Sequence, residues 1–248
     1  MTRPLGRLLA VLAREFRMRR PPTIHRRASC GQEVEFWRSW FATRGLQWPE
    51  DYRFRTDPHA EVEDPVLREV LEATPGTTVS LLDVGAGPIT IVGFRYPSKN
   101  LAITAIDPLA REYDRILREH AIEPPVRTQP LHGEELLKRF APGSFDVAYS
   151  CNALDHTVDP LPIIDNMVVV VRGGGHVVLR HARKEAVTRE YRQLHQWNFD
   201  ERDGRCIVWR RPGRERDIAA ELGHRVDVRC ARDQFIGYEW VCCVLRKR

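Results

Sequence analysis

The sequence predicts an α/β fold in which a doubly wound, mostly parallel sheet follows an N-terminal helical extension. In the C-terminal two thirds of the chain, short apolar runs of strand length alternate with helix-like segments and are separated by short turns. Two of these helices follow an aspartate and a proline, at Asp107 and Asp159. We therefore expect the extension to occupy residues 1–76 and the α/β domain to occupy residues 77–248.

The first 27 residues are far more basic than the rest. They hold eight arginines and one acid, Glu15, whereas the whole chain has a net charge of +5, so the remainder sums to about −2. Residues 5–18 place leucines and Phe16 on one face of a predicted helix. Three interpretations stay open: a lid over the domain, a weak membrane-surface contact through residues 1–20, and a targeting peptide. We favour the lid, because the segment has no cleavage-like site.

A second helix is predicted from a capping box at Ser29 to about Arg44. Its apolar stripe is rich in aromatic side chains, and Trp37 is one of them. Packing of this stripe onto the core is one interpretation, and an aromatic wall of a binding pocket is the other. The stretch 48–55 is expected to be an irregular connection, followed by a short helix over residues 66–73.

The stretch VSLLDVGAGPIT, residues 79–90, is typical of a buried strand that ends in a tight glycine turn. Asp83 lies at the end of this strand, where a charge is costly unless a cation or a hydrogen-bond donor meets it. Gly85 and Gly87 let a ligand approach the backbone without meeting a Cβ atom. The next strand ends in Asp107, which can hold ribose hydroxyls, cap the following helix, or do both.

Four motifs now give a family resemblance: DVGAGP, AIDP, SFDVAYSCNALDHTVDP and RGGGHVVLR. In this order and spacing they resemble the class I S-adenosylmethionine-dependent methyltransferases, type 11-like, over residues 79–180. The resemblance implies a Rossmann-like sheet of seven strands with an antiparallel last strand. It also implies S-adenosylmethionine as the methyl donor and S-adenosylhomocysteine as the product. An NAD-binding oxidoreductase of the same fold is an alternative, which Thr90 disfavours because it replaces the last glycine of that motif.

The resemblance implies a set of donor-binding residues. Asp83 would order the methionine ammonium group, the glycine turn would pass under the methionine part, and Asp107 would hold the ribose. The stretch that contacts adenine in this family has His132 where an acid is usual. The implied donor site is Asp83, Gly85, Ala86, Gly87, Asp107, Pro108, His132, Gly133, Glu134 and Asn152.

Residues at the ends of later strands are candidates for the methyl acceptor side. His156, four residues past Asn152, is the candidate general base, although it can also simply brace its loop. Arg180 and His181 leave the fifth strand toward the same rim, where a cation would suit a carboxylate or phosphate. An insertion over residues 182–212 is expected to cap the substrate. The predicted acceptor-binding residues are Trp37, Arg180, His181, His195 and Trp197.

The remaining elements complete the predicted sheet. A glycine run at 173–175 is expected to turn the chain sharply into the fifth strand. The expected strands are 145–150, 176–180, 206–209, 225–230 and 240–245. The expected helical segments are 107–120, 160–171, a polar stretch after His181 that includes 194–199, and 212–222.

Composition and charge exclude several classes of protein. The chain is 42% hydrophobic and 29% charged, which is ordinary for a globular protein. No apolar run approaches the roughly 18 residues of a membrane span. The six cysteines lack metal-type spacing, so buried reduced thiols, no metal site and a cytoplasmic location are expected. The nearly neutral body disfavours nucleic acid as a partner.

The sequence thus predicts a methyltransferase that acts on a small-molecule or peptide acceptor. O-methylation, for example of a carboxylate in natural-product metabolism, is the favoured reaction. N-methylation is the first alternative. A non-catalytic binding module that keeps the fold but has lost the donor is another, which the intact Asp83, Gly85, Gly87 and Asp107 disfavour.

Overall fold

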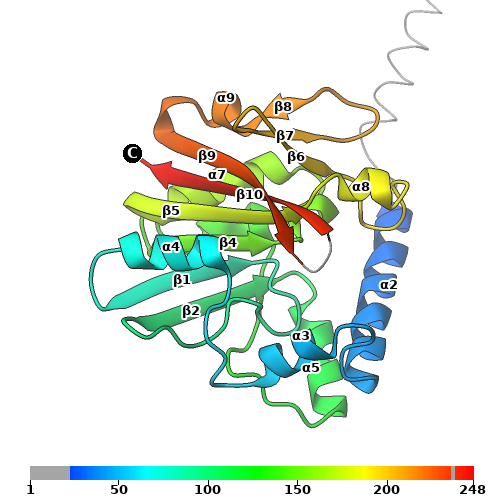
Figure 1. The fold of residues 1–248 in the computed structure, drawn as a ribbon. Helices are drawn as coiled ribbons and strands as arrows, with labels where there is room; N and C mark the ends of the chain where they lie inside the picture. Colours follow the sequence, from blue (N-terminus) through cyan, green and yellow to red (C-terminus); the bar gives the residue numbers. More distant parts are fainter. Residues whose placement is uncertain (1–22, 236–237) are drawn as a thin grey trace, which may run out of the picture.

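The computed structural model describes residues 23–235 and 238–248, and it confirms the predicted fold class (Figure 1). Seven strands form one sheet in the order β3-β2-β1-β4-β5-β10-β9. Neighbours from β3 to β5 are parallel, whereas β10 runs antiparallel to both β5 and β9. The strands are β1 (Thr78–Val84), β2 (Asn100–Asp107), β3 (Gln129–Pro130), β4 (Phe145–Cys151), β5 (Val171–Ala182), β9 (Val226–Phe235) and β10 (Tyr238–Lys247).

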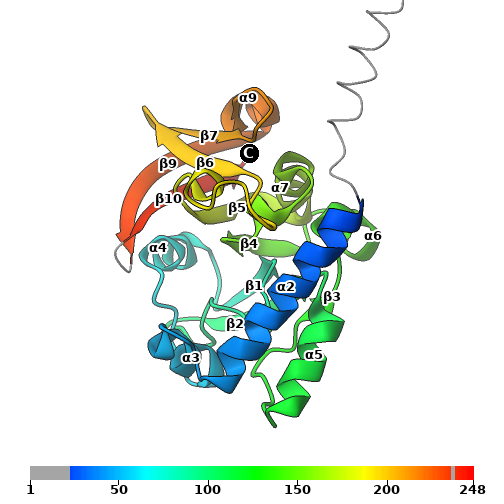
Figure 2. The same cartoon turned by 90° about the vertical axis from the view of Figure 1, so that its right-hand side faces the viewer.

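The central strands are apolar on both faces, as expected for a parallel sheet between two helical layers. In β1, Leu82 belongs to the core on one face and Leu81 to the core on the other. Helix α7 (Pro160–Val170) packs on the first face and α4 (Pro65–Ala73) on the second (Figures 1 and 2). The predicted aspartate cap at Asp159 is confirmed, because Asp159 accepts the N–H of Leu161, and Asp64 caps α4 in the same way by accepting from Val66 and Leu67. The predicted cap at Asp107 is wrong, since the helix after β2 begins at Ala110 and its N-cap is Leu109.

The N-terminal helix α2 (Thr23–Ala42) lies alongside α5 (Ala110–Glu119), as Figure 2 shows. Trp40 and Phe41 of α2 are buried in a core that they share with Tyr113 and Ile116 of α5. This helix begins six residues before the predicted capping box, so Ser29 lies inside the helix. The predicted helix over residues 5–18 falls outside the described residues.

The stretch predicted as an irregular connection is a helix, α3 (Pro49–Thr56). Proline occupies its first turn together with Glu50 and Asp51, and its last turn carries Arg53 and Arg55. Acids near the start and bases near the end stabilise a helix through its dipole. The aromatic residues of this stretch obscured that charge pattern.

The insertion after β5 forms a second sheet of three antiparallel strands, β6 (Asn198–Arg202), β7 (Arg205–Trp209) and β8 (Arg216–Asp217). This sheet was not predicted, but its middle strand β7 matches the strand expected over residues 206–209. Phe199 and Val208 pack against Val241 and Cys243 of β10, so this sheet continues the layer of α7. The predicted helical character of 194–199 is therefore wrong. The shorter elements are α6 (Leu136–Arg139), α8 (Glu185–Thr188), α9 (Ile218–Leu222) and the 3-10 turns η1 (Gly133–Glu135), η2 (Leu154–His156) and η3 (Gly223–Arg225).

Two further sequence predictions need correction. The predicted helix 212–222 is reduced to α9, because Pro212 and Gly213 do not support helix in its first half. The glycine run does not precede β5 but lies within it as a bulge, since residues 172–175 face the single residue Asp146 between two paired positions. Gly175 is needed there, because a Cβ atom on it would lie 2.7 Å from the carbonyl oxygen of Asp146.

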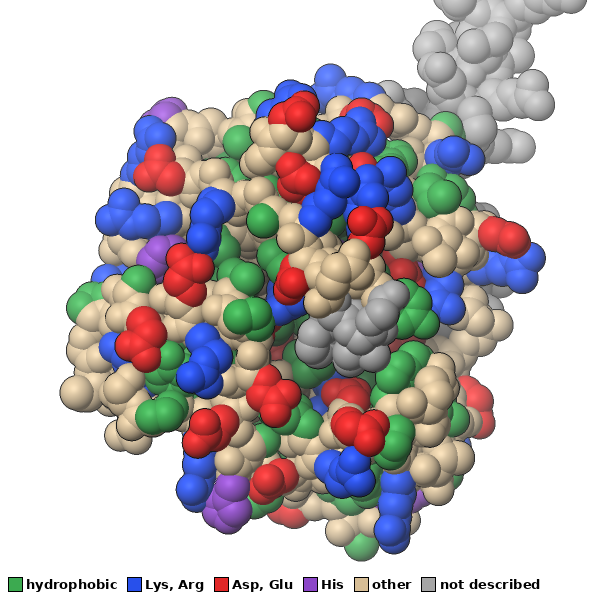
Figure 3. Space-filling model, in the orientation of Figure 1, with side chains coloured by type: hydrophobic (Ala, Val, Ile, Leu, Met, Phe, Trp, Pro, Cys, Tyr) green, Lys and Arg blue, Asp and Glu red, His purple; other side chains and the backbone are tan. Residues whose placement is uncertain are grey.

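The surface mixes both signs of charge. Lys and Arg side chains are interspersed with Asp and Glu over the face shown in Figure 3. Cys206, Cys230, Cys242 and Cys243 are buried and form no disulfide, as expected for reduced thiols, whereas Cys151 is half-buried. Among the helices of residues 23–235 and 238–248, none is both long enough and apolar enough to cross a bilayer.

Candidate active site

The glycine turn joins the carboxyl ends of β1 and β2. Gly85 and Gly87 both have positive φ, +77° and +66°, which L side chains rarely adopt. The N–H groups of Gly85 and Ala86 donate to the carbonyl oxygen of Ile106 over 2.9 and 3.1 Å. The N–H of Gly87 donates to Oδ2 of Asp107 over 3.2 Å. The turn is therefore fixed to the second strand before any ligand binds.

Two protein groups approach the glycines of this turn. A Cβ atom on Gly85 would lie 2.3 Å from Cβ of Ala153, in the loop after β4. A Cβ atom on Gly87 would lie 3.2 Å from Cζ2 of Trp37, in α2. The indole N–H of Trp37 donates to Glu33 over 2.9 Å. Trp37, predicted as an acceptor contact, therefore covers the turn assigned to the donor.

We expect Gly85→Ala to lower the free energy of unfolding by about 3 kcal/mol, since it combines the strained φ with a steric clash. Gly174→Ala is the matched control. Gly174 has a φ of +74° but nothing within 4 Å of its added Cβ, so its cost should be about 1 kcal/mol. Urea unfolding of both variants measures the difference. Equal losses would show that contact with Ala153 does not constrain the turn.

Two buried carboxyl groups flank the turn. Asp83 is 1% exposed and accepts a 2.5 Å hydrogen bond from Oγ1 of Thr90. Burial raises the pKa of Asp83 to about 6 against the effects of Thr90 and Arg55. Asp107 accepts from the N–H of Leu109 over 2.8 Å, and burial raises its pKa to about 7.

These carboxyls fit the expected donor. A buried carboxylate whose charge is only partly met favours a ligand that brings a cation or hydroxyl donors. S-adenosylmethionine brings both, an ammonium group suited to Asp83 and ribose hydroxyls suited to Asp107. Because Asp107 binds the N–H groups of Gly87 and Leu109, its oxygens are already oriented at the end of β2. Pro108 follows it directly at the same edge.

The residues predicted to contact adenine occupy a 3-10 turn. Gly133 and Glu134 lie in η1, directly after His132; His132 and Glu134 are exposed and Gly133 is buried. A Cβ atom on Gly133 would lie 2.6 Å from Cγ2 of Ile163, so this glycine allows close packing on α7. The side-chain oxygen of Asn152, also predicted to bind the donor, accepts the N–H of Ala182 over 3.1 Å and therefore faces β5.

A cluster of three polar side chains lies at the end of β4. Nδ1 of His195 lies 2.8 Å from Oδ2 of Asp155 and 3.1 Å from Nε2 of His156. Nε2 of His156 is 3.4 Å from the same carboxylate oxygen. The N–H groups of Gln196 and Trp197 donate to the carbonyl oxygen of Asp155, which ties the two segments together. The structure thus unites His156 and His195, which the sequence placed on separate elements, and adds Asp155.

Charges within this cluster support one another. Burial opposes ionisation of Asp155, but His156 and the hydrogen bond from His195 lower its pKa. Burial also opposes protonation of His195, yet its hydrogen bond to Asp155 raises its pKa. Nearby, His181 is 1% exposed and stacks on Phe199 at 3.9 Å. Burial lowers the pKa of His181 to about 4, so its ring is neutral at neutral pH.

Two residues predicted to bind the acceptor have structural roles instead. Arg180 lies 3.0 Å from Asp64 and 2.9 Å from Asp233, so its charge is balanced inside the protein rather than facing an acceptor. Trp197 is buried, and its indole N–H donates to the carbonyl oxygen of Thr157 over 3.1 Å. It therefore fastens the loop that carries His156.

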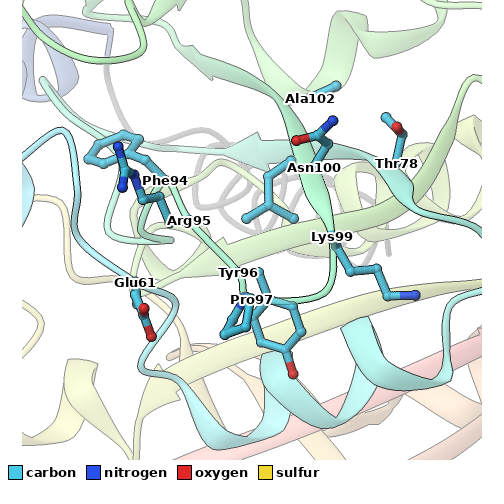
Figure 4. Close-up of a pocket in the computed structure, with 10 residues that line it drawn as sticks. Glu61, Thr78, Phe94, Arg95, Tyr96, Pro97, Lys99, Asn100 and Ala102 are labelled. Atoms are coloured by element: carbon cyan, nitrogen blue, oxygen red, sulfur yellow. The ribbon is translucent and has the colours of Figure 1, made fainter.

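A separate pocket lies at the amino ends of β1 and β2, on the side of the sheet away from the glycine turn. Its volume is about 550 Å³, and its lining includes Thr78, Tyr96, Lys99 and Asn100 (Figure 4). Thr78 and Asn100 are the first residues of β1 and β2. In parallel α/β sheets, ligands bind at the carboxyl ends of the strands, so this pocket at the amino ends does not belong to the glycine-turn site.

Comparison with known proteins agrees with the geometry. Residues 82–179 match the family model of a methyltransferase domain. The ubiquinone biosynthesis O-methyltransferases of three Xanthomonas campestris pv. campestris strains are each 34% identical to this chain over 108 residues. That match covers 43% of this chain and 44% of each relative, so the chain spans less than half their length.

Solved structures share the whole fold at low identity. One is Burkholderia thailandensis 1,6-didemethyltoxoflavin-N1-methyltransferase with bound 1,6-didemethyltoxoflavin and S-adenosylhomocysteine, with a TM-score of 0.52, 14% identity and 92% of each chain covered. Another is a Haemonchus contortus N-methyltransferase in complex with phosphomonomethylethanolamine and S-adenosylhomocysteine, with a TM-score of 0.50, 14% identity, and 79% of this chain and 56% of that chain covered. The strand order and the paired carboxyls agree with the domain match, so residues 82–179 resemble a methyltransferase domain in both sequence and fold.

Proposed function

We propose that this protein methylates an oxygen atom of a small-molecule or peptide acceptor. The observation that carries this proposal is the cluster of Asp155, His156 and His195 beside the glycine turn. A hydroxyl acceptor must lose a proton as it attacks the methyl carbon, so it benefits from a nearby base. The curated relatives that match part of the chain are O-methyltransferases, which supports the same reaction.

His156 is proposed to accept the proton. Its Nε2 faces Asp155 and His195, so Nδ1 is the nitrogen left for the acceptor hydroxyl. Asp155 would stabilise the imidazolium that forms, because its carboxylate lies 3.4 Å from Nε2. His195 is a positioning residue, because its Nδ1 contacts both Asp155 and His156 and so fixes their relative orientation.

The donor would be held by the two carboxyls and the turn. When bound, S-adenosylmethionine supplies a methyl carbon already activated by the sulfonium. Asp83 would bind its ammonium group and Asp107 its ribose, while the adenine contacts of His132, Gly133 and Glu134 are proposed from their position after β3. Trp37 covers the turn, which helps to exclude water from the reacting groups. A cytoplasmic location belongs to the same proposal.

Calorimetry tests the donor half of this proposal. S-adenosylmethionine and S-adenosylhomocysteine should each bind with a stoichiometry of one, and NAD should release no heat. Absence of binding by both nucleosides would contradict the proposal. Incubation with isotopically labelled donor and matched phenol, carboxylic acid and amine acceptors tests the other half. Label on the amine alone would assign N-methylation instead.

A further inference from the structure

The cluster at the end of β4 brings three possible ligand atoms to one point. Oδ2 of Asp155, Nε2 of His156 and Nδ1 of His195 lie 2.8, 3.1 and 3.4 Å from one another. They come from two segments, η2 and the loop before β6, that are far apart in the sequence. Backbone hydrogen bonds from Gln196 and Trp197 to Asp155 hold these segments together, so the convergence does not depend on the three side chains.

No placement of protons on the two ring nitrogens uses all three ligand atoms of this triangle fully. A ring nitrogen carries either a proton or a lone pair. If both Nδ1 of His195 and Nε2 of His156 are protonated, two N–H groups face each other 3.1 Å apart. If Nδ1 of His195 is unprotonated, its lone pair faces the carboxylate oxygen of Asp155 at 2.8 Å. If only Nδ1 of His195 is protonated, it donates to Asp155, but the lone pair of Nε2 of His156 lies 3.4 Å from the same carboxylate oxygen. A cation at the centre would use all three lone pairs at once.

The spacing suits such a cation. Metal–ligand bonds to imidazole nitrogen and carboxylate oxygen are about 2.0–2.2 Å long, so neighbouring ligand atoms lie about 3.0 Å apart in octahedral and about 3.4 Å apart in tetrahedral geometry. The three observed separations fall near this range. Two imidazoles and one carboxylate on one face are a known ligand set for divalent first-row transition metals.

A second observation points the same way. Oδ1 of Asp155 is buried and has no hydrogen-bond partner among the described residues, although the side chain is only 1% exposed. An unpartnered buried carboxylate oxygen is costly unless a cation meets it, and an ion held by both oxygens of Asp155 would meet Oδ1 as well as Oδ2. His156 and His195 are 20% and 18% exposed, so one side of the cluster stays open to water or to an acceptor oxygen.

We propose that Asp155, His156 and His195 bind one divalent transition-metal ion and leave open coordination positions toward the acceptor. This site was not expected from the sequence, which predicted no metal. Metal binding does not depend on methyl transfer, and only its role toward the acceptor rests on the proposed function. With the metal bound, Nε2 of His156 would be a ligand; coordination would lower the pKa of an acceptor hydroxyl, and its proton would pass to water at the open side of the cluster.

Cobalt and zinc titrations test the site without donor or acceptor. Tag-free protein is treated with a chelator, desalted and titrated with Co²⁺ while its visible absorption is recorded, and Zn²⁺ then displaces the cobalt. We expect one Co²⁺ per chain. His156→Ala and His195→Ala should each weaken binding at least about tenfold. His224→Ala, an exposed histidine in η3, should bind as the wild type does.

Two results would overturn the proposal. One is the lack of stoichiometric Co²⁺ binding by folded wild-type protein. The other is equal affinity in the wild type and in both folded variants, with circular dichroism as the folding check. Because S-adenosylmethionine is absent from these titrations, failure of the metal proposal leaves donor binding and methyl transfer to be judged by their own assays.

Discussion

Replacing His156 by alanine is expected to slow methyl transfer to a hydroxyl acceptor by about 10²- to 10⁴-fold, the usual contribution of a positioned general base. Donor affinity should stay unchanged, because the donor carboxyls lie at the ends of β1 and β2 and not in the loop after β4. Single-turnover assays with saturating donor measure the chemical step, and calorimetry measures donor affinity.

The matched control for this variant is His224→Ala, which removes an exposed imidazole far along the chain. His195→Ala should have a smaller effect than His156→Ala, since His195 acts by holding its partners. Wild-type turnover by the folded His156→Ala variant would disprove a role for this residue in the reaction. It would leave His156 as a brace of its loop.

Loss of turnover in His156→Ala fits both a base and a metal ligand, so the metal content must be varied as well. A free imidazole base keeps its activity after chelation. A metal-dependent site loses activity in the chelated wild type and regains it with Zn²⁺ or Co²⁺. The His156→Ala variant should respond to neither treatment. Activity is therefore measured before chelation, after chelation and after metal is added back, for both the wild type and His156→Ala. This comparison distinguishes a general base from a metal ligand.

The donor half of this protein could be predicted because local rules decide it. Apolar strands, aspartate caps and a glycine turn follow from neighbouring residues alone, and β1, β2, β4 and α7 lie where these signals placed them. The position of Asp107 at the end of a predicted strand already placed its carboxyl group next to the glycine turn. The family resemblance covered the same region, so pattern and physical argument agreed there.

The acceptor half depends on contacts between segments distant in sequence. Nothing near His195 indicates that it meets Asp155, 40 residues away, and the link is made by an unpredicted sheet. The partners of Arg180 could not be predicted for the same reason, because Asp64 lies far before it in the sequence and Asp233 far after it. Asp155 stands next to His156 in the sequence, but its role could be assigned only once the structure placed His195 beside it.

Asp107→Ala is expected to weaken binding of S-adenosylmethionine by at least about 100-fold. Two ribose hydroxyls would lose a charged hydrogen-bond acceptor, and such bonds contribute about 1.5–3 kcal/mol each. Calorimetry with S-adenosylhomocysteine, which has the same ribose, gives an independent measurement. Glu123→Gln is the control, since that side chain is 81% exposed in the structure. Unchanged affinity in Asp107→Ala would mean that the ribose does not lie at the end of β2.

The raised pKa of Asp107 gives this prediction a distinct pH dependence. In the donor-free protein the carboxyl is protonated below about pH 7, and only the ionised form accepts both ribose hydroxyls. Donor affinity should therefore increase as the pH rises toward 7 and level off above it. Asp83, with a pKa of about 6, adds a similar step at lower pH.

Stability of the donor-free protein should change in the opposite direction. Between pH 4 and 7 the folded protein retains a proton on Asp107 that the unfolded chain, with a carboxyl pKa near 3.8, has already released. The free energy of unfolding therefore decreases as the pH rises through this window. Asp107→Asn cannot ionise, so it should flatten both trends together. A variant that weakens donor binding but keeps the wild-type pH profile of stability would show that burial does not raise the pKa of Asp107.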